Sequence, residues 1–380
     1  MLFEDLVVNV EKGKETNEFH TDSCSIGDYY IFRGYGCVDP IYGGEEPILL
    51  NMGPGLAAQF GAVANDKVLL QSTVLGINPQ FVPPPGDRRA VEKINNCTEY
   101  LKIMHGRYKD FKKIASVPFA IFALYYWDTN YQHFIVETYP RIWIASHFAR
   151  RYGLPIIVLD APHIRELITL TMPDLVRHCE VIYVQKDEAV EVTQGCLWPS
   201  AIGQNMARIT PAQAEALRSL RRHIVTAADT VDHVAPEGRR VFLYRMNLAS
   251  NTAGGRLMSN IDAFVEIVQK RGFSTVVLEN KTLPQKRDAL RGAGAVVSPA
   301  GANLINLLFL DRGARLLVLS HPGFGAFPFF EELFRTCEIE LERCELFLPV
   351  TSTEPEKNPG LSAYDVHLPS FELQLDALLA

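Results

Sequence analysis

Four polar side chains recur along one predicted helix at spacings that suit acid–base chemistry. Asn130, His133, Glu137 and Arg141 are separated by three, four and four residues, which places them on one helical face. A carboxylate one turn from an imidazole can orient the ring and increase its basicity, so His133 and Glu137 form a candidate catalytic pair. The same spacing also occurs in helices that carry a structural His–Glu hydrogen bond on a solvated face, and the spacing alone leaves that alternative open.

The segment around this polar stripe is aromatic and aliphatic, so its polar groups need partners or a cavity. A helix is expected to start near Asn130, to be kinked or split by Pro140 and to end at Gly153. The apolar residues 154–159 then predict a buried strand.

Two arginines in the C-terminal half form a candidate anion site. Arg245 is expected at the end of a strand over residues 241–245, where α/β sheets bind ligands. Arg256 ends the Gly-rich segment 251–256, just before a helix that Ser259 can cap. Guanidinium groups and the free N–H groups of a helix start both suit phosphate. Two surface arginines without a ligand are the alternative.

A turn of small residues, Ser298-Pro299-Ala300-Gly301-Ala302-Asn303, is a third candidate. It joins a predicted strand to a predicted helix, so a phosphate could approach the backbone of that helix closely. A turn that only packs the helix on the sheet would have the same composition.

These candidates depend on a regular alternation of strands and helices after residue 240. Strands are predicted over residues 241–245, 275–278, 295–298 and 316–319, and helices are predicted after Ser259, after Thr282 and over residues 302–310. Alternation of this kind predicts βαβ units and a parallel sheet. We therefore expect a Rossmann-like domain at about 226–345, followed by a final helix in FELQLDALLA.

The N-terminal half is less regular. Residues 1–90 predict short strands and loops, residues 81–86 a stiff Pro-rich connector, and residues 88–114 a helix. A strand is expected near 181–184, and Thr210-Pro211 is expected to open a further helix. The expected domains are 1–225, β-rich over 1–90 and α/β over 91–225, and 226–380.

Composition removes several classes of function. The 380 residues carry a formal net charge of −7, which disfavours a protein whose main partner is nucleic acid. The seven cysteines are scattered and form no C-x-x-C, which favours reduced thiols and a cytosolic location over a zinc site or a disulfide framework. Residues 1–15 lack the pattern of a signal peptide, and Pro299 and two asparagines interrupt the most apolar run, residues 292–310. P-loop, G-x-S-x-G, H-E-x-x-H and D-x-D motifs are absent, and D-x-D is the metal-binding pair of one large class of sugar transferases.

Taken together, these segments resemble glycosyltransferase family sixty-one. Residues 130–141, NYQHFIVETYPR, resemble the family signature N-Y-x-H-[FW]-x-x-E-x-x-P-R. Further matches follow in order and spacing over about 119–320: Arg245, Arg256, Asn260, Gly272-Phe273, Glu279, Gln285, Gly301, Ala302 and Asn306. The family includes bacterial proteins of capsular polysaccharide synthesis, plant xylosyltransferases and animal O-linked N-acetylglucosaminyltransferases.

The resemblance implies a GT-B architecture, in which two Rossmann-like domains face each other across a cleft. The C-terminal domain would bind the nucleotide and the N-terminal domain most of the acceptor. Two departures matter: Ile261 stands where the family has Glu, and Ala300 where it has His. They could mean a different donor sugar, a changed mechanism or lost catalysis.

The resulting hypothesis is a nucleotide-sugar-dependent glycosyltransferase that acts on a glycan or glycolipid, with inversion and without a metal or other cofactor. His133 would be the base, activated by Glu137, while Asn130 and Arg141 would orient the substrates. The donor, expected to be a UDP-sugar, would be held by Arg245, Arg256, Asn260, Glu279, Gln285, Gly301, Ala302 and Asn306. The expected location is cytoplasmic, with association at the inner membrane face left open. A non-catalytic nucleotide- or glycan-binding protein and a hydrolase using His133 and Glu137 are the rivals.

Overall fold

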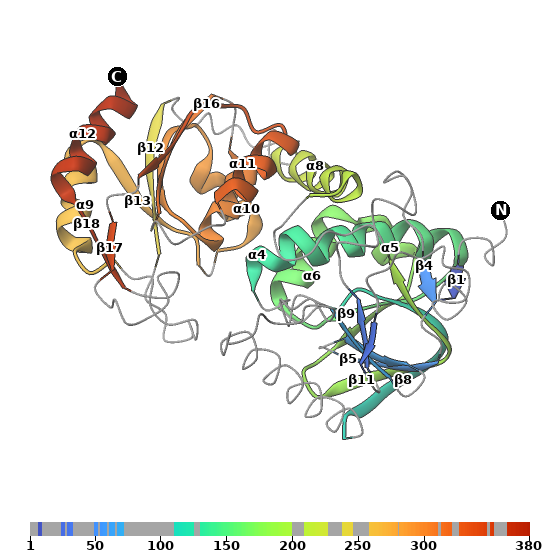
Figure 1. Ribbon diagram of the computed structural model, residues 1–380. Helices are drawn as coiled ribbons and strands as arrows, with labels where there is room; N and C mark the ends of the chain where they lie inside the picture. Colours follow the sequence, from blue (N-terminus) through green and yellow to red (C-terminus); the bar gives the residue numbers. More distant parts are fainter. Residues whose placement is uncertain are drawn as a thin grey trace, which may run out of the picture. The chain divides into compact units, whose positions relative to one another are not determined.

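Figure 1 shows the computed structural model of the protein. The residues that it describes are 7–9, 24–26, 29–32, 49–51, 54–58, 61–64, 67–71, 110–124, 130–199, 209–226, 238–245, 258–279, 281–310, 313–320, 327–347, 350–352 and 363–380. The chain divides into two compact units, Met1–Leu217 and Arg218–Ala380. This division falls inside helix α8 (Pro211–Thr226), whereas the sequence analysis placed a boundary at 225. Each unit is described by itself below.

Within the described part of residues 1–90, the structure contains seven short strands. These are β1 (Val7–Asn9), β2 (Cys24–Ile26), β3 (Tyr29–Phe32), β4 (Leu49–Asn51), β5 (Gly55–Ala58), β6 (Gly61–Ala64) and β7 (Lys67–Gln71). The Pro-rich connector and the predicted helix up to residue 109 lie outside the described residues. The end of that predicted helix is wrong, because β8 (Lys112–Phe122) already begins at Lys112 and pairs there with the start of β11 (Glu188–Pro199).

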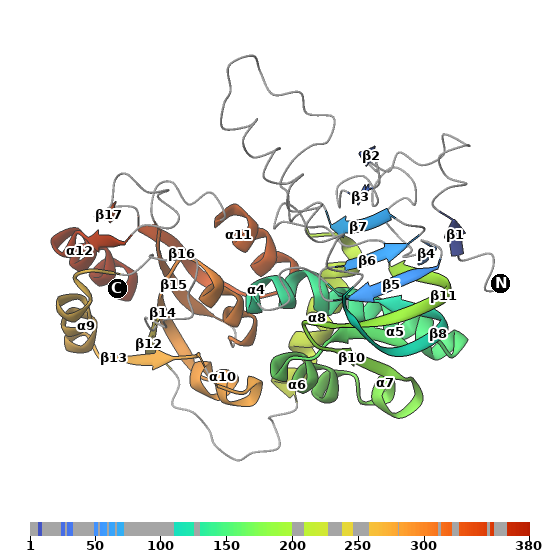
Figure 2. The ribbon, with the colours of Figure 1, turned by 90° about the horizontal axis from the view of Figure 1, so that it is seen from below.

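The sheet of the first unit is parallel from β10 to β11 and mostly antiparallel beyond β11, where only the β7–β3 pair among the described strands on this path is parallel. Its order is β10-β9-β8-β11-β5-β6-β7-β3-β2, and Figure 2 shows β5, β6 and β7 continuing the sheet beyond β11. β10 (Val181–Val184), β9 (Ile156–Leu159), β8 and β11 run parallel. In the chain these four strands follow one another as β8, β9, β10 and β11, but in the sheet β8 lies between β9 and β11. From β8, the chain first adds β9 and β10 on one side and then adds β11 on the other, so β8 and β11 flank a topological switch point. Ligands of open α/β sheets bind at the carboxyl ends of strands at such a point.

Three consecutive helical segments follow β8, and their ends agree with the sequence analysis. Asn130 caps α4 (Tyr131–His133), because its side chain accepts a hydrogen bond from the Gln132 N–H. A π-helical turn, η2 (Phe134–Thr138), separates α4 from α5 (Tyr139–Tyr152). The helix predicted from Asn130 to Gly153 is therefore divided just before Pro140, where its π-helical turn changes to the α-helix α5. Gly153 ends α5 with a φ of 66°, a left-handed conformation that favours glycine.

The remaining crossover of the first unit runs through two short helices. The predicted buried strand is β9, whose four residues are all buried, and α6 (Pro162–Thr171) and α7 (Pro173–His178) connect it to β10. α6 buries Ile164, Leu167 and Ile168 at helical spacing, which explains why this segment packs as a helix.

The second unit contains a parallel five-stranded sheet in the order β13-β12-β14-β15-β16. The strands are β12 (Arg239–Tyr244), β13 (Phe273–Val277), β14 (Ala293–Pro299), β15 (Ala314–Leu319) and β16 (Leu341–Phe347). Numbered along the unit, the order is 2-1-3-4-5, which is a common doubly wound order with its switch point between the first and third strands. The Rossmann-like sheet expected from the sequence is thereby confirmed, and β12 and β14 flank its switch point.

Helices cover both faces of this sheet. They are α9 (Ile261–Lys270), α10 (Leu283–Leu290), the 3₁₀ helix η3 (Ala302–Phe309), α11 (Phe327–Thr336) and α12 (Leu368–Leu379); a small hairpin, β17 (Val350–Ser352) and β18 (Tyr364–Val366), precedes α12. Thr282 caps α10 as predicted, through a reciprocal capping box with Gln285. The expected cap at Ser259 is wrong by one residue, since Asn260 occupies the N-cap position of α9.

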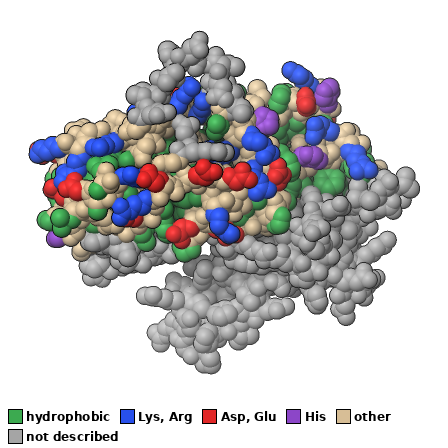
Figure 3. All heavy atoms as spheres, turned by 90° about the horizontal axis from the view of Figure 1, so that it is seen from above, with side chains coloured by type: hydrophobic (Ala, Val, Ile, Leu, Met, Phe, Trp, Pro, Cys, Tyr) green, Lys and Arg blue, Asp and Glu red, His purple; other side chains and the backbone are tan. Residues whose placement is uncertain are grey.

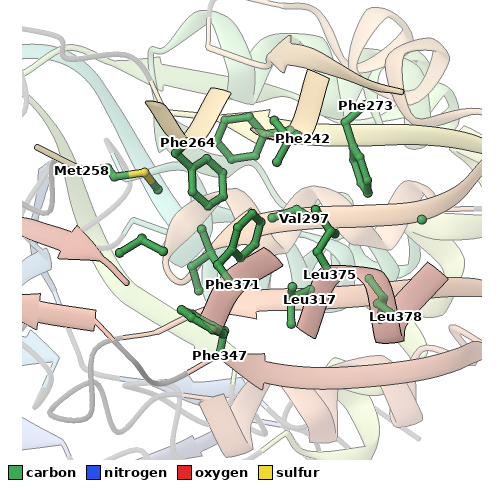
Figure 4. Packing of buried hydrophobic residues seen from close by; sticks show 14 of the residues in the cluster. Phe242, Met258, Phe264, Phe273, Val297, Leu317, Phe347, Phe371, Leu375 and Leu378 are labelled. Atoms are coloured by element: carbon green, nitrogen blue, oxygen red, sulfur yellow. The ribbon is translucent and has the colours of Figure 1, made fainter. Parts of the chain in front are cut away.

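The core between the sheet and the layer formed by α9 and α12 contains several aromatic side chains (Figure 4). Phe371 of α12 packs against Phe264 of α9 with ring centroids 4.3 Å apart, and against Phe347 of β16 at 5.7 Å. Leu375 and Leu378 extend the apolar face of α12 over the sheet. The final helix predicted from the sequence therefore belongs to the second unit.

The surface carries charges of both signs. On the face shown in Figure 3, cationic and anionic side chains are interspersed with apolar ones. Ion pairs of the second unit include Lys270 with Glu266 at 2.7 Å, and Arg271 with Glu372 at 3.0 Å and with Asp376 at 2.6 Å. Within the described residues, no helix has the length and apolarity that crossing a membrane would require.

Candidate active site

His133 and Glu137 meet on the π-helical turn. The Nδ1 atom of His133 lies 3.4 Å from Oε2 of Glu137. The side chain of Glu137 is 1% exposed and that of His133 is 18% exposed, so the carboxylate is shielded while part of the ring reaches solvent. The Nδ1 atom of His133 is directed at Glu137, and this arrangement suits a base that is oriented by a buried carboxylate.

Asn130 and Arg141 lie at the two ends of the same polar stripe, in different environments. The Asn130 side chain is partly buried and caps α4. Arg141 is fully buried in α5, one turn after Glu137. Burying an isolated charge is costly, so a buried Arg141 close in sequence to a buried Glu137 favours charge compensation inside the unit rather than direct contact with a ligand.

Two tyrosines of this segment are held in their neutral form. Burial, reinforced by the nearby Glu166 carboxylate, raises the pKa of Tyr131 well above its ordinary value. Burial also raises the pKa of Tyr139, partly offset by a hydrogen bond with Thr171. Neither phenol is suited to act as a base, which leaves His133 as the best candidate on this turn.

The sequence analysis missed one contact of this turn. Gln213 of α8 donates from Nε2 to the carbonyl oxygen of Val136 at 2.8 Å, and both groups are buried. The Thr210-x-x-Gln213 spacing marks a capping box, so the sequence could have placed Gln213 at the start of α8. Its contact with a residue 77 positions earlier has no sequence signal.

In the second unit, three candidate donor-site residues follow adjacent strands at the carboxyl edge. Arg245 directly follows β12, Glu279 lies just after β13, and Gly301 just after β14. Arg245 and Glu279 are partly buried and Gly301 is buried. Because parallel strands end at the same edge, the fold brings these residues together around the β12/β14 switch point.

Gly301 and Ala302 lead into η3, where two asparagines lie one turn apart. Gly301 has a φ of 136°, which favours glycine, and Ala302 is the first residue of η3. Asn306 is 3% exposed and donates from Nδ2 to the carbonyl of Asn303 at 3.1 Å. The Oδ1 atom of Asn306 and the Nδ2 atom of Asn303 are buried and have no hydrogen-bond partner among the residues that the structure describes. Buried polar atoms are nearly always paired, so a bound ligand is a natural partner for them.

Two other candidates do not join this group, and a third is not described by the structure. The Asn260 amide binds the backbone of β18, donating to the Val366 carbonyl at 2.7 Å and accepting from the Val366 N–H at 3.1 Å. Gln285 is exposed and completes the α10 capping box. Arg256 lies outside the described residues. Asn260 and Gln285 thus have structural roles that their position in a motif could not reveal.

The described residues contain no group of three or more His, Cys, Asp or Glu side chains placed to hold a metal ion. The cationic and amide groups at the carboxyl edge of the second unit are suited instead to an anionic ligand such as a diphosphate.

Comparison with known proteins supports the resemblance seen in the sequence. No curated protein matches the chain. The model of one protein family, described as Glycosyltransferase 61, matches residues 131–317. The match begins at Tyr131, includes the His133–Glu137 turn and ends within β15 of the second sheet. This match supports membership of the chain in glycosyltransferase family 61.

Proposed function

We propose that the protein transfers a sugar from a nucleotide-sugar, with a UDP-sugar as the expected donor, to a hydroxyl of a glycan or glycolipid. The observation that carries this proposal is the grouping of Arg245, Glu279 and Gly301 at the carboxyl ends of three adjacent parallel strands. An arginine and a glycine turn leading into a helix suit a diphosphate, and a carboxylate can accept hydrogen bonds from ribose hydroxyls.

In this proposal the second unit holds the donor. Arg245 binds the diphosphate together with the start of η3 at Gly301 and Ala302, while Asn306 hydrogen-bonds the ligand. Arg256 is assigned to the diphosphate on its sequence position alone. The cationic groups stabilise the charge that develops on the departing diphosphate, so the reaction needs no divalent ion.

His133 of the first unit acts as the base. Nε2 takes the proton of the acceptor hydroxyl, the hydroxyl oxygen forms a bond to the anomeric carbon, and the bond from that carbon to the diphosphate breaks. The nucleoside diphosphate leaves with the bonding electrons, and a single displacement inverts the anomeric centre. Glu137 orients the ring through Nδ1 and stabilises the imidazolium.

A GT-B arrangement, with the two units facing each other across a cleft, would bring the two groups of residues to one substrate. The absence of a D-x-D motif supports this part of the proposal. We further propose that the reaction occurs in the cytoplasm, at or near the inner membrane face, in the synthesis of a surface polysaccharide such as a capsule.

A ligand screen followed by a transfer assay tests this function. UDP-, GDP-, CMP- and TDP-sugars are each added to the full chain, and the melting temperature is measured, because a ligand that binds only the folded state raises it. The stabilising donor is then incubated with glycan and glycolipid acceptors and the product is identified by mass spectrometry. We expect a UDP-sugar to stabilise the protein and its sugar to appear on an acceptor.

One observation favours a second candidate, a nucleotide- or glycan-binding protein without catalysis. Ile261 replaces a family Glu and packs against the hydrophobic core of the second unit, and Ala300 replaces a family His. Binding of a nucleotide-sugar without transfer or hydrolysis under all acceptor conditions would select this candidate.

A further inference from the structure

The π-helical turn leaves one backbone carbonyl without its ordinary helical partner. In an α-helix the carbonyl of Val136 would accept a hydrogen bond from the N–H of residue 140. Residue 140 is proline, which has no N–H and whose ring crowds the carbonyl four residues earlier. The chain widens here instead, and the Tyr139 N–H bonds the carbonyl of Phe134, five residues back.

Gln213 supplies the missing donor from another helix. Its Nε2 donates to the Val136 carbonyl at 2.8 Å, while its Oε1 accepts from the Thr210 N–H at 3.0 Å. The Thr210 hydroxyl in turn accepts from the Gln213 N–H at 3.2 Å. Gln213 and Thr210 are each 2% exposed, so this amide is fixed at both ends within a buried environment.

We propose that Gln213 is a positioning residue for the His133–Glu137 pair, because it holds the π-helical turn in the form that places the Glu137 carboxylate against the His133 ring. Val136 immediately precedes Glu137, so movement of the Val136 carbonyl rotates the peptide that carries the carboxylate. This inference rests on the proposed function in assigning the pair to catalysis, but the support of the turn by Gln213 can be measured without any reaction.

Two substitutions separate the two hydrogen bonds of the Gln213 side chain. Gln213→Glu keeps the oxygen that completes the capping box, since Glu is also frequent at this position, but a carboxylate cannot donate to the Val136 carbonyl. Gln213→Met has similar length and removes both bonds. The corresponding control is Gln285→Glu in the Thr282–Gln285 capping box of α10, where the same change leaves the first unit untouched.

The first measurement follows the turn itself. Amide hydrogen exchange of residues 134–138 and the ring nitrogen signals of His133 are recorded by NMR in the wild-type chain and in each variant. We expect faster exchange and shifted His133 signals in both Gln213 variants, and wild-type values in Gln285→Glu. Wild-type exchange and His133 signals in folded Gln213 variants would overturn the proposal, whether or not the chain transfers sugar.

The second measurement follows catalysis once transfer has been established. A displaced base costs on the order of 10–100-fold in kcat, whereas affinity for the nucleotide is set by other residues and should not change. A protonated carboxyl can donate a hydrogen bond, so the ratio of Gln213→Glu turnover to wild-type turnover should rise as the pH falls. A loss of kcat that is equal at every pH in Gln213→Glu would contradict the role of the donated hydrogen bond.

A double-mutant cycle with Pro140→Ala tests whether Gln213 acts through the Val136 carbonyl. It restores an N–H that can bond the Val136 carbonyl, so the turn should need Gln213 less. We expect Gln213→Met to accelerate hydrogen exchange of residues 134–138 less in the Pro140→Ala background than in the wild type. Equal acceleration in both backgrounds would mean that Gln213 does not act through this carbonyl.

Discussion

The Nδ1 atom of His133 lies 3.4 Å from Oε2 of Glu137, and the two side chains differ in exposure, at 18% and 1%. The carboxylate is therefore shielded from solvent while the ring remains accessible from one side. A shielded group can orient and stabilise its neighbour, but it cannot exchange a proton with a substrate directly. This asymmetry gives the two residues different predicted effects on turnover.

Replacement of His133 should affect catalysis more than any other change on this turn. Because general-base catalysis contributes roughly 10²–10⁴-fold, His133→Ala should lower kcat by about that factor. Glu137→Gln should lower kcat less, since it removes an orienting charge and leaves the base in place. Steady-state kinetics measure both effects, and calorimetry with the nucleotide should show unchanged affinity in His133→Ala. A kcat within the wild-type range for folded His133→Ala would remove His133 from catalysis.

Arg245 should contribute to nucleotide affinity through the diphosphate. Since a hydrogen bond to a charged group is worth about 1.5–3 kcal/mol, Arg245→Ala should weaken binding by that amount. Titration calorimetry with the nucleotide that stabilises the protein most measures this loss. Lys270→Ala, which removes an exposed positive charge of the same unit, is the matched control and should bind as the wild type does. Equal affinities for the two variants would exclude Arg245 from the donor site.

The alternating half of the chain was predictable because its signals are local. Apolar runs such as Val241–Leu243 and Leu316–Leu319 are buried between layers. Thr282 marks a helix start through its side-chain cap, and Gly153 marks a helix end through its left-handed backbone conformation. The strand order could not be predicted in the same way. Pairing of β12 with both β13 and β14 depends on tertiary packing, although the general rule that ligands bind at carboxyl ends correctly indicated the environment of Arg245.

The features that sequence patterns missed depend on contacts between distant residues. The place of Asn260 in the family motif predicted a residue of the donor site, yet its amide binds the backbone of Val366, 106 positions later. The Pro140 signal predicted a break but not the π-helical turn, since the turn is stabilised by a side chain from α8. The early start of β8 was missed because Lys112 and Lys113 are exposed polar residues whose strand conformation follows from pairing with β11.

Asn260 should affect stability through its contact with β18. Its amide makes two hydrogen bonds to the Val366 backbone, so Asn260→Ala should lower the free energy of unfolding by about 1–3 kcal/mol. Chemical denaturation followed by the far-UV circular dichroism signal measures the change. Unchanged stability together with a loss of nucleotide affinity would show that Asn260 contributes to donor binding rather than to the contact with β18.

Transfer should proceed without a divalent ion. The proposed donor site relies on arginines and a helix start, and such groups stabilise a leaving diphosphate by fixed charge. Activity measured in the presence of EDTA should therefore equal activity in untreated enzyme. Complete loss of transfer with EDTA that manganese restores would count against this mechanism and would direct attention to carboxylates of the chain.

Asn306 should show opposite effects on stability and binding. Its Oδ1 atom is buried and has no partner among the described residues, and leaving such a polar group unpaired costs about 1–3 kcal/mol. Asn306→Leu has a similar volume, removes this penalty and loses the Nδ2 bond to Asn303. We expect the unliganded variant to melt at the wild-type temperature or above it, and to bind the nucleotide more weakly by calorimetry. A variant that is clearly less stable but binds the nucleotide with wild-type affinity would show that Asn306 supports η3 and has no part in ligand binding.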